Sequence, residues 1–292
     1  MTAIAEPASE RTMTAPMKTH TVPGGGGLRL HAREWGNPAG RPIVFIHGWS
    51  QSHLGWHRQI DSRLRDEFRL VAFDLRGHGM SDAPLQSQHY THAGLWAYDL
   101  AAIIHELELE RPVLVGWSYG AFVICDYVRA YGQDNIGAIE LVAGAVKLGE
   151  TAFGTLIGPG FLDHFGGATA EDLPTNIDAM RGLVRAFSTR PLPATEVERL
   201  LAASMTVPAR VRANLAAREI DDDDVLRALE VPVLVSHGCA DTIVLPAMAD
   251  HILAVCPTAE MSWYQDTAHV PHLEHPERFN RELTELTRRV RA

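Results

Sequence analysis

The 292-residue sequence predicts an α/β protein with a mostly parallel sheet flanked by helices. Short runs of branched apolar residues, typical of buried parallel strands, recur along the chain. Segments with a helical apolar side separate most of these runs, and this alternation favours a sheet covered by helices on both faces. One long stretch, residues 147–230, breaks the alternation, and we call it the inserted segment.

The first elements predicted are a tail and a hairpin. Residues 1–17 are expected to form a mobile tail, and they lack the basic region and apolar core of a secretion signal. Two edge strands, at 18–22 and 28–35, are predicted on either side of a glycine-rich turn. The turn is not followed by the Lys-Ser/Thr pair or the helix of a phosphate-binding loop, so a simple turn is the better interpretation.

The remaining sheet strands and their helices follow in order. Strands are predicted at 42–46, 70–73, 113–115, 138–143, 231–235 and 260–264. Helices are predicted around 56–64, 92–107 and 121–130, and an amphipathic one at 276–290. The inserted segment shows helical patterns near 173–187, 194–205 and 208–220, but no convincing strand. We interpret it as a helical cap on a core domain of residues 18–146 and 231–292, with an independent binding domain as the alternative.

Composition limits the classes of partner. The net charge of -10 argues against nucleic acids and anionic membranes as partners, because both need a basic protein surface. No stretch approaches the roughly 20 apolar residues of a membrane span. The three cysteines, Cys125, Cys239 and Cys256, are odd in number and spread out, as expected for reduced thiols in a cytoplasmic protein.

The most informative stretch is the pentapeptide Gly116-Trp117-Ser118-Tyr119-Gly120. It lies between a predicted strand and a predicted helix, which is the context of a nucleophile elbow. The turn is so tight that the positions two residues before and after the serine can carry almost no side chain, and glycine occupies both. The helix that follows would direct its N-terminal N–H groups at an anion formed beside Ser118.

A serine nucleophile needs a base, and the base needs an orienting acid. Asp241 follows the strand predicted at 231–235, and His269 follows the strand predicted at 260–264. In a parallel sheet the loops after these strands emerge at the same edge as Ser118. The chain order of serine, acid and histidine is that of the α/β-hydrolase arrangement. Asp266, close before His269, is an alternative acid.

Over nearly its whole length, from about Thr19, the chain resembles the α/β-hydrolase superfamily. The matching motifs are His47-Gly48-Trp49, Asp74-Leu75-Arg76-Gly77-His78-Gly79-Met80-Ser81, Gly116-Trp117-Ser118-Tyr119-Gly120, His237-Gly238-Cys239-Ala240-Asp241 and His269-Val270-Pro271-His272-Leu273-Glu274-His275-Pro276. The resemblance implies an eight-stranded sheet with Ser118 as nucleophile, His269 as base and then acid, and Asp241 as orienting acid. It also implies an oxyanion hole made by the backbone N–H groups of Trp49 and Tyr119, and no cofactor.

Other polar clusters have simpler explanations than chemistry. The resemblance implies that Asp74 and Arg76 brace the scaffold. The aspartates at 221–224 are interpreted as an N-cap and first helical turn, and not as a metal site. A metal site at His269, His272 and His275 is disfavoured because Pro271 and Pro276 break a regular helix. Trp117 and His47 are assigned to the substrate pocket, although a structural role in the oxyanion loop is the stronger interpretation for His47.

The serine decides which reactions are open. Epoxide hydrolases and haloalkane dehalogenases share this fold but use an aspartate, whose alkyl ester water can cleave, whereas a serine would leave an ether. We therefore expect acyl transfer from a small ester or lactone. The alternatives are a cofactor-free perhydrolase, a carbon–carbon bond hydrolase, a cofactor-independent dioxygenase, or a ligand-binding receptor with a slow triad. Perhydrolases usually carry proline where this chain has Ser50. Substrate identity and oligomeric state are not specified by the sequence.

Overall fold

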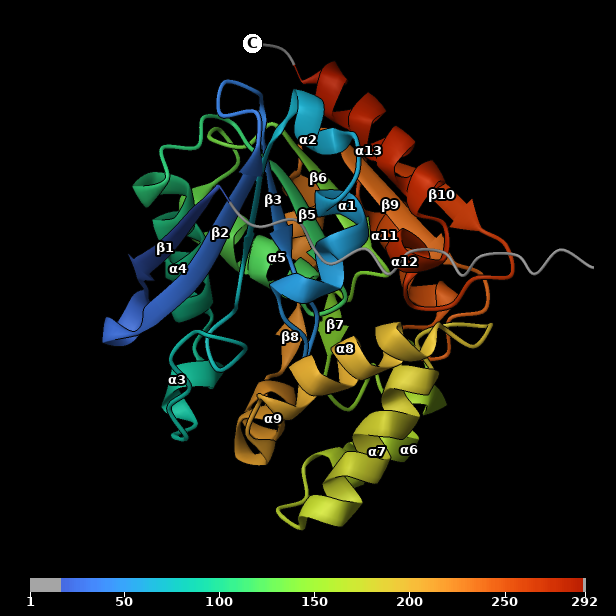
Figure 1. The fold of residues 1–292 in the computed structure, drawn as a ribbon. Coiled ribbons are helices and arrows are strands. Elements are labelled where there is room, and N and C mark those ends of the chain that lie inside the picture. Colours follow the sequence, from blue (N-terminus) through green and yellow to red (C-terminus); the bar gives the residue numbers. More distant parts are fainter. Residues whose placement is uncertain (1–16, 291–292) are drawn as a thin grey trace, which may run out of the picture.

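A computed structural model describes residues 17–290, and its central element is an eight-stranded sheet (Figure 1). The strands lie in the order β1-β2-β4-β3-β5-β6-β9-β10. The six strands from β4 to β10 are mutually parallel, and β2 runs against β1 and β4. The fold class predicted from the sequence is therefore confirmed. The strand bounds are Lys18–Pro23 (β1), Arg29–Gly36 (β2), Pro42–Ile46 (β3), Arg69–Phe73 (β4), Val113–Trp117 (β5), Ala138–Val142 (β6), Val233–Gly238 (β9) and Ala259–Tyr264 (β10).

The central strands owe their place to their composition. Every residue of β3, β5 and β6 is buried, as expected for strands covered by helices on both faces. The N-terminal hairpin forms as predicted around a 3₁₀ turn at Gly25–Gly27, but of its two strands only β1 lies at an edge of the sheet. The prediction that β2 is also an edge strand is wrong, because β2 pairs with β4 on its other side.

The predicted mobile tail lies almost wholly outside the described residues. Of residues 1–17, only Met17 is described, and its backbone N–H donates to the carbonyl of Glu34 on β2.

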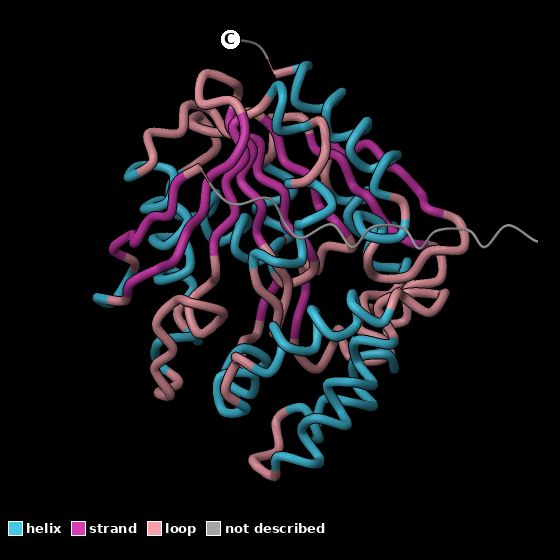
Figure 2. Tube along the Cα trace, viewed as in Figure 1, coloured by secondary structure: helices cyan, strands magenta, loops and turns pink. Residues whose placement is uncertain are grey.

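Helices cover both faces of the sheet (Figure 2). On one face α4 (Ala93–Glu106), α5 (Gly120–Tyr131), α10 (Asp223–Ala228) and α11 (Pro246–Val255) contact one another or the strands. On the other face α1 (His57–Ile60), α2 (Leu64–Glu67), α12 (Pro271–Glu274) and α13 (Pro276–Arg289) do the same. Helix α13 is amphipathic as predicted and buries Phe279, Leu283 and Leu286 on one side. No described helix is long and apolar enough to span a membrane.

The helix predicted at 56–64 is not continuous. It is divided into a 3₁₀ turn, η2 (His53–Trp56), and the two short helices α1 and α2. The hydroxyl of Ser62 donates to the Gln59 carbonyl and accepts the N–H of Leu64. This side chain therefore replaces helical backbone bonds, which is why the apolar pattern alone overestimated the helix.

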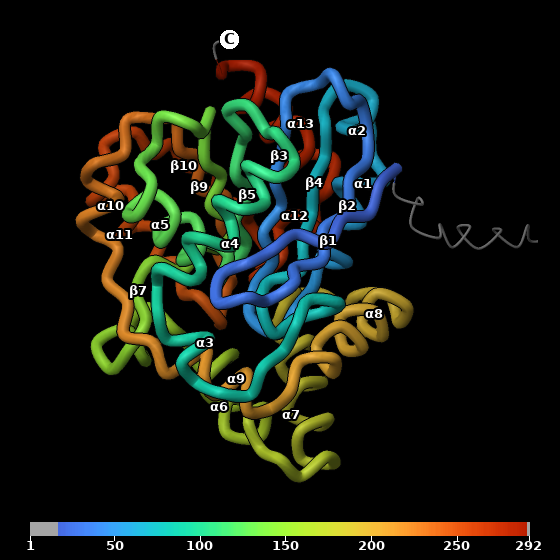
Figure 3. Tube along the Cα trace, turned by 90° about the vertical axis from the view of Figure 1, so that its left-hand side faces the viewer, coloured from blue at the N-terminus to red at the C-terminus, as the bar shows by residue number. Residues whose placement is uncertain are grey.

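The inserted segment lies at the carboxyl ends of the parallel strands, below the sheet in Figures 1 and 3. It contains α6 (Pro159–Ala168), α7 (Leu173–Arg185), α8 (Ala194–Met205) and α9 (Ala209–Ala216). Helix α6 was missed because glycines interrupt its apolar pattern. The prediction of no strand is also wrong, since β7 (Lys147–Leu148) and β8 (Ile220–Asp221) form an antiparallel pair where the segment leaves and rejoins the core. Two-residue strands are too short for an alternating pattern to reveal.

The acidic run after β8 begins a helix, as predicted. Asp222 is the N-cap of α10, and Asp223 and Asp224 lie in its first turn. Basic side chains neutralise the run, since Lys147 pairs with Asp223 and Arg129 with Asp224. A remaining short helix, α3 (Gln88–Thr91), lies beside α9.

Candidate active site

Ser118 occupies a strained turn between β5 and α5. Its φ is 53°, a left-handed value that non-glycine residues rarely adopt outside functional sites. The flanking glycines are required by close packing: a Cβ on Gly120 would lie 2.5 Å from the Ile46 carbonyl oxygen, and one on Gly116 would lie 2.7 Å from a methyl of Ile124. The turn thus has the geometry of the predicted nucleophile elbow.

Asp241 and His269 meet at the same edge of the sheet. His269 Nδ1 lies 2.8 Å from Asp241 Oδ2, and both side chains are almost fully buried. The other carboxylate oxygen, Oδ1, accepts the backbone N–H groups of Ile243 and Val244 at 2.8 and 3.2 Å. The carboxylate is therefore fixed in orientation, and it fixes the imidazole in turn.

The competing acid and metal interpretations do not match the geometry. Asp266 has an exposed side chain, whereas Asp241 contacts the imidazole. His272 packs between the rings of Trp56 and Trp117, with centroid distances of 4.5 and 5.0 Å, and His275 is exposed beside Tyr264. Among the described residues, no three metal-ligating side chains form a group that could hold an ion.

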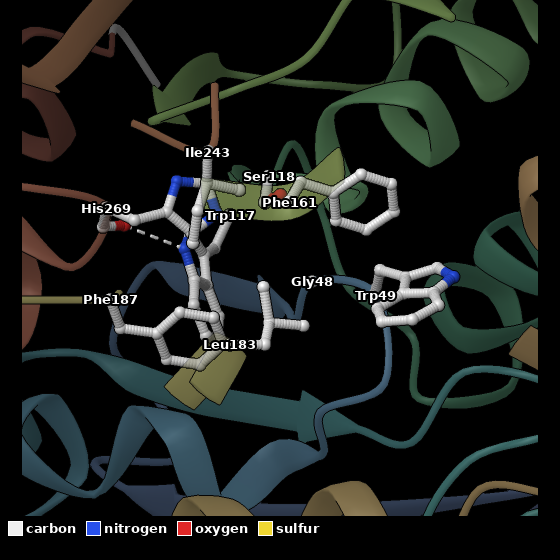
Figure 4. A pocket seen from close by; sticks show the side chains of 9 residues that line it. All are labelled: Gly48, Trp49, Trp117, Ser118, Phe161, Leu183, Phe187, Ile243 and His269. Carbon is white, nitrogen blue, oxygen red and sulfur yellow. Dashed lines mark hydrogen bonds between the residues drawn. The ribbon is translucent and has the colours of Figure 1, made fainter. Parts of the chain in front are cut away.

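Ser118 and His269 line one cavity of about 280 Å³, including its open mouth (Figure 4). Trp117 supports this arrangement, because its indole N–H donates to the His269 carbonyl over 3.0 Å. The Ser118 hydroxyl forms no hydrogen bond to another described residue. Since Nδ1 of His269 is engaged by Asp241, Nε2 is the nitrogen available to the hydroxyl. Such catalytic contacts often tighten only when substrate binds.

The loop after β3 lies directly against the serine. A Cβ on Gly48 would lie 3.1 Å from Ser118 Cβ, which shows how closely the loop approaches. The backbone N–H groups of Trp49 and Tyr119 donate to no acceptor within the described part of the chain. Both residues line the cavities that border the serine, so these two N–H groups can donate to a ligand or to water there.

Buried histidines support this loop from behind. His47 Nε2 accepts the Leu75 N–H, and its Nδ1 donates to the Gly48 carbonyl. His78 Nε2 accepts the Ser50 N–H, and its Nδ1 donates to the Arg76 carbonyl. Burial lowers the pKa of His47 to about 4 and that of His78 to about 3, so both rings stay neutral at physiological pH and keep an acceptor nitrogen.

Of the two residues that the sequence assigned to the pocket, one lines a cavity and the other does not. Trp117 lines the cavity beside Ser118. His47 is fully buried and lines neither cavity next to Ser118, so it supports the loop instead of contacting substrate. The physical reason is that both of its ring nitrogens are engaged by backbone groups. Asp74 is likewise buried in the scaffold, where it accepts the backbone N–H groups of His53 and Met80.

A second cavity of about 400 Å³, including its open mouth, also borders Ser118 and Trp49. It shares Phe161 and Ile243 with the first cavity but does not include His269. Its wall is almost entirely apolar, and the residues found only there are Tyr119, Phe122, Ala145, Leu148, Ile157, Ala216 and Val244.

The inserted segment is hydrogen-bonded to the loops that carry the site, which sequence reasoning did not foresee. The backbone N–H of His269 donates to the Phe187 carbonyl over 2.9 Å. Glu274 accepts the N–H of Ala268 and, through its other oxygen, the hydroxyl of Thr189. Glu274 could have drawn attention as the only acid in the motif from His269 to Pro276, but nothing in the sequence pointed to its partner, Thr189, in the inserted segment.

Comparison with known proteins identifies the family. The model of the alpha/beta hydrolase family matches residues 43–282. The chain belongs to the α/β-hydrolase family. A putative aryl esterase from Burkholderia cenocepacia is 34% identical, with a TM-score of 0.88 over 93% of this chain and 98% of that one. An esterase from Rhodococcus sp. ECU1013 is also 34% identical, with a TM-score of 0.89 over 94% of this chain and 100% of the other.

More distant relatives of this α/β-hydrolase differ in their recorded activity. A non-heme chloroperoxidase from Streptomyces lividans is 28% identical over 273 residues, which is 90% of this chain and 97% of the relative. Together with the esterase similarities, the family assignment makes the chain a hydrolase of the carboxylic-ester type.

Proposed function

We propose that this hydrolase is a serine esterase or lactonase that cleaves small, largely apolar substrates through an acyl-enzyme. The observation that carries the proposal is the 2.8 Å contact between His269 and Asp241 in the loops next to Ser118. The unpartnered N–H groups of Trp49 and Tyr119 support it, because they are the donors that a tetrahedral oxyanion needs.

In the first half of the reaction, Ser118 Oγ attacks the carbonyl carbon of the substrate and its proton moves to His269 Nε2. The carbonyl oxygen becomes an oxyanion and accepts the N–H groups of Trp49 and Tyr119. Collapse of this intermediate breaks the bond to the alcohol oxygen, which takes the proton from His269. The imidazolium formed in between is stabilised by the carboxylate of Asp241.

In the second half, water attacks the acyl-enzyme and gives its proton to His269. The second oxyanion collapses, Ser118 recovers the proton, and the carboxylic acid leaves. Each N–H donor of the oxyanion hole contributes on the order of 10²–10³ in rate.

The two cavities suggest separate sites for the two parts of the substrate. The leaving alcohol must lie within reach of His269, so we assign it to the cavity that contains this residue. The acyl group then occupies the second, apolar cavity, which borders Ser118 but does not include His269. Phe161 of α6 and Leu183 of α7 line the first cavity, so the inserted segment acts as a cap that selects substrates.

Perhydrolysis is a second candidate because a non-heme chloroperoxidase is among the relatives. Ser50 argues against it. Its φ is 58° and its N–H donates to His78. The proline usual in perhydrolases could adopt neither feature, since its ring fixes φ near about −65° and it has no N–H. The loop of this chain is therefore built differently, which favours hydrolysis.

Fluorophosphonate labelling tests the nucleophile. Wild type should be labelled with one equivalent, and Ser118→Ala should not be labelled. Hydrolysis of p-nitrophenyl esters should be lost in Ser118→Ala and reduced by several orders of magnitude in His269→Ala. Equal labelling of wild type and Ser118→Ala would overturn the proposal.

Two matched substitutions test the assignment of the cavities. Leu183 lines only the cavity assigned to the alcohol, and Leu148 only the one assigned to the acyl group. Leu183→Trp should lower kcat/KM for bulky alcohols with a short acyl group, and Leu148→Trp should do so for bulky acyl groups with a short alcohol. The opposite pattern would reverse the assignment, and preference for short charged acids would remove the apolar acyl site.

A further inference from the structure

The structure contains a buried arginine without an acidic partner. Arg212, on α9 of the inserted segment, is 1% exposed, and no described carboxylate forms an ion pair with it. Its guanidinium donates instead to neutral oxygens: the hydroxyl of Ser50, the Asn176 amide and the carbonyls of Ala168 and Ser204. A buried charge held only by neutral groups is expensive, so its position calls for an explanation beyond packing.

The contact on which the inference depends joins Arg212 to Ser50, 162 residues earlier in the chain. Arg212 Nε donates to Ser50 Oγ over 2.9 Å, and this hydroxyl in turn reaches the Ser204 carbonyl at 3.4 Å. Ser50 has the left-handed φ of 58°, a conformation that surrounding contacts must hold in place. The guanidinium and His78, which accepts the Ser50 N–H, hold it from two directions.

Arg212 also holds the residue before Ser50. The indole N–H of Trp49 donates to the Arg212 carbonyl over 3.2 Å. One residue of the inserted segment therefore fixes the side chain of Trp49 and the conformation of the residue that follows it. The other end of the guanidinium is held at the end of α6, on α7 and on α8, so the loop is tied to the packing of all these helices.

We propose that Arg212 is a positioning residue, which holds the loop at Trp49 and Ser50 so that the Trp49 N–H is directed at the oxyanion. The proposal rests on the proposed role of Trp49 as an oxyanion donor. Arg212 touches no reacting atom. Through Arg212, stabilisation of the transition state depends on how the helices of the inserted segment pack. The inserted segment therefore does more than form a wall of the pocket.

The test compares three variants. Ser50→Ala removes the acceptor of the Arg212 Nε–H but leaves the arginine and the helices in place. Arg212→Met removes the guanidinium at similar length. Glu196→Gln is the control, since Glu196 is a buried residue of α8 that ties the inserted segment to His57 and not to the loop. Each is measured for kcat and KM on a p-nitrophenyl ester, for melting temperature, and for inhibition by a trifluoromethyl ketone, whose adduct with Ser118 carries an oxyanion.

Ser50→Ala should lower kcat about 10-fold with KM within about twofold, and weaken the ketone by the same factor, because only oxyanion binding is affected. Arg212→Met, where it folds, should lower kcat and weaken ketone inhibition more than Ser50→Ala does. Glu196→Gln should lower the melting temperature without changing kcat or ketone inhibition more than about twofold.

If Ser50→Ala keeps the kcat and ketone affinity of wild type, or changes them no more than Glu196→Gln does, Arg212 has only a structural role and the proposal is wrong. If the proposed function itself is wrong, the result is different: the wild-type protein will show no hydrolysis that depends on Ser118 and no inhibition by the ketone.

Discussion

The substitution Asp241→Asn tests the orientation of the base with little change of shape. Oδ1 of Asp241 accepts two backbone N–H groups, from Ile243 and Val244. In the variant this position must be taken by the amide oxygen, because an NH₂ group there would face two donors. The NH₂ group therefore replaces Oδ2, which lies 2.8 Å from His269 Nδ1.

The consequence is the wrong tautomer of histidine. An NH₂ group donates to Nδ1, so the ring proton must sit on Nε2, the nitrogen that should receive the proton of Ser118. Loss of both the tautomer and the stabilising charge is expected to lower kcat by roughly 10³–10⁴-fold. This corresponds to about 4–5.5 kcal/mol of transition-state stabilisation.

The assay is steady-state hydrolysis of a p-nitrophenyl ester, with Asp266→Asn as the matched control. Asp266 is exposed and should tolerate the change with kcat within about twofold. The reasoning would be refuted if Asp241→Asn kept more than a tenth of the wild-type kcat. If Asp266→Asn instead lost activity, Asp266 would be the orienting acid.

Three further predictions concern stability. Gly120→Ala should destabilise the protein by at least about 1–3 kcal/mol, since its Cβ would lie 2.5 Å from the Ile46 carbonyl oxygen; Gly94→Ala, whose Cβ meets no neighbour, should be neutral or stabilising in the same thermal unfolding experiment. Burial raises the pKa of Glu140 to about 8 from 4.5, so the folded state holds its proton between these values. The contribution of Glu140 to the free energy of unfolding should therefore fall by roughly 1 kcal/mol per pH unit as pH rises across them. Glu140→Gln should make stability fall less steeply between pH 5 and 8 by this amount in chemical denaturation, and a variant with the wild-type slope would contradict the assignment. Arg218→Met leaves the buried Asp126 carboxylate without its 2.7 Å partner and should cost about 3–5 kcal/mol, whereas the double change with Asp126→Leu should recover much of the loss in chemical denaturation.

Local sequence patterns were sufficient to predict an element wherever a short stretch of chain determines its own conformation. The apolar runs predicted the five inner parallel strands, since burial on both faces leaves a signature within five residues. The sixth parallel strand, β10, was also predicted, although it lies at the edge of the sheet and is only partly buried. The glycines around Ser118 predicted the elbow, because side chains are excluded on both sides of the serine, at Gly116 by α5 and at Gly120 by the end of the neighbouring strand β3. The order of Ser118, Asp241 and His269 predicted their meeting at one sheet edge, because parallel strands all end there.

Sequence patterns left alternatives open where the fold, and not the local sequence, decides which side chains meet. The sequence could not exclude Asp266 as the acid, because exposure and contact with the imidazole exist only after folding. It left His47 between the pocket and a structural role in the loop, and in the fold both ring nitrogens of His47 are engaged by backbone groups of the loops after β3 and β4.

What the sequence by itself determined is the sheet, the strained serine and the set of residues available for acyl transfer, all of which depend on contacts local in the chain or on the parallel topology. Only the tertiary structure decided which residues of the inserted segment contact the loop beside Ser118. Arg212 and Ser50 are 162 positions apart, and neither carries a motif that points to the other. Their contact arises because four helices pack together at the strand ends, and packing of that kind is a property of the whole fold.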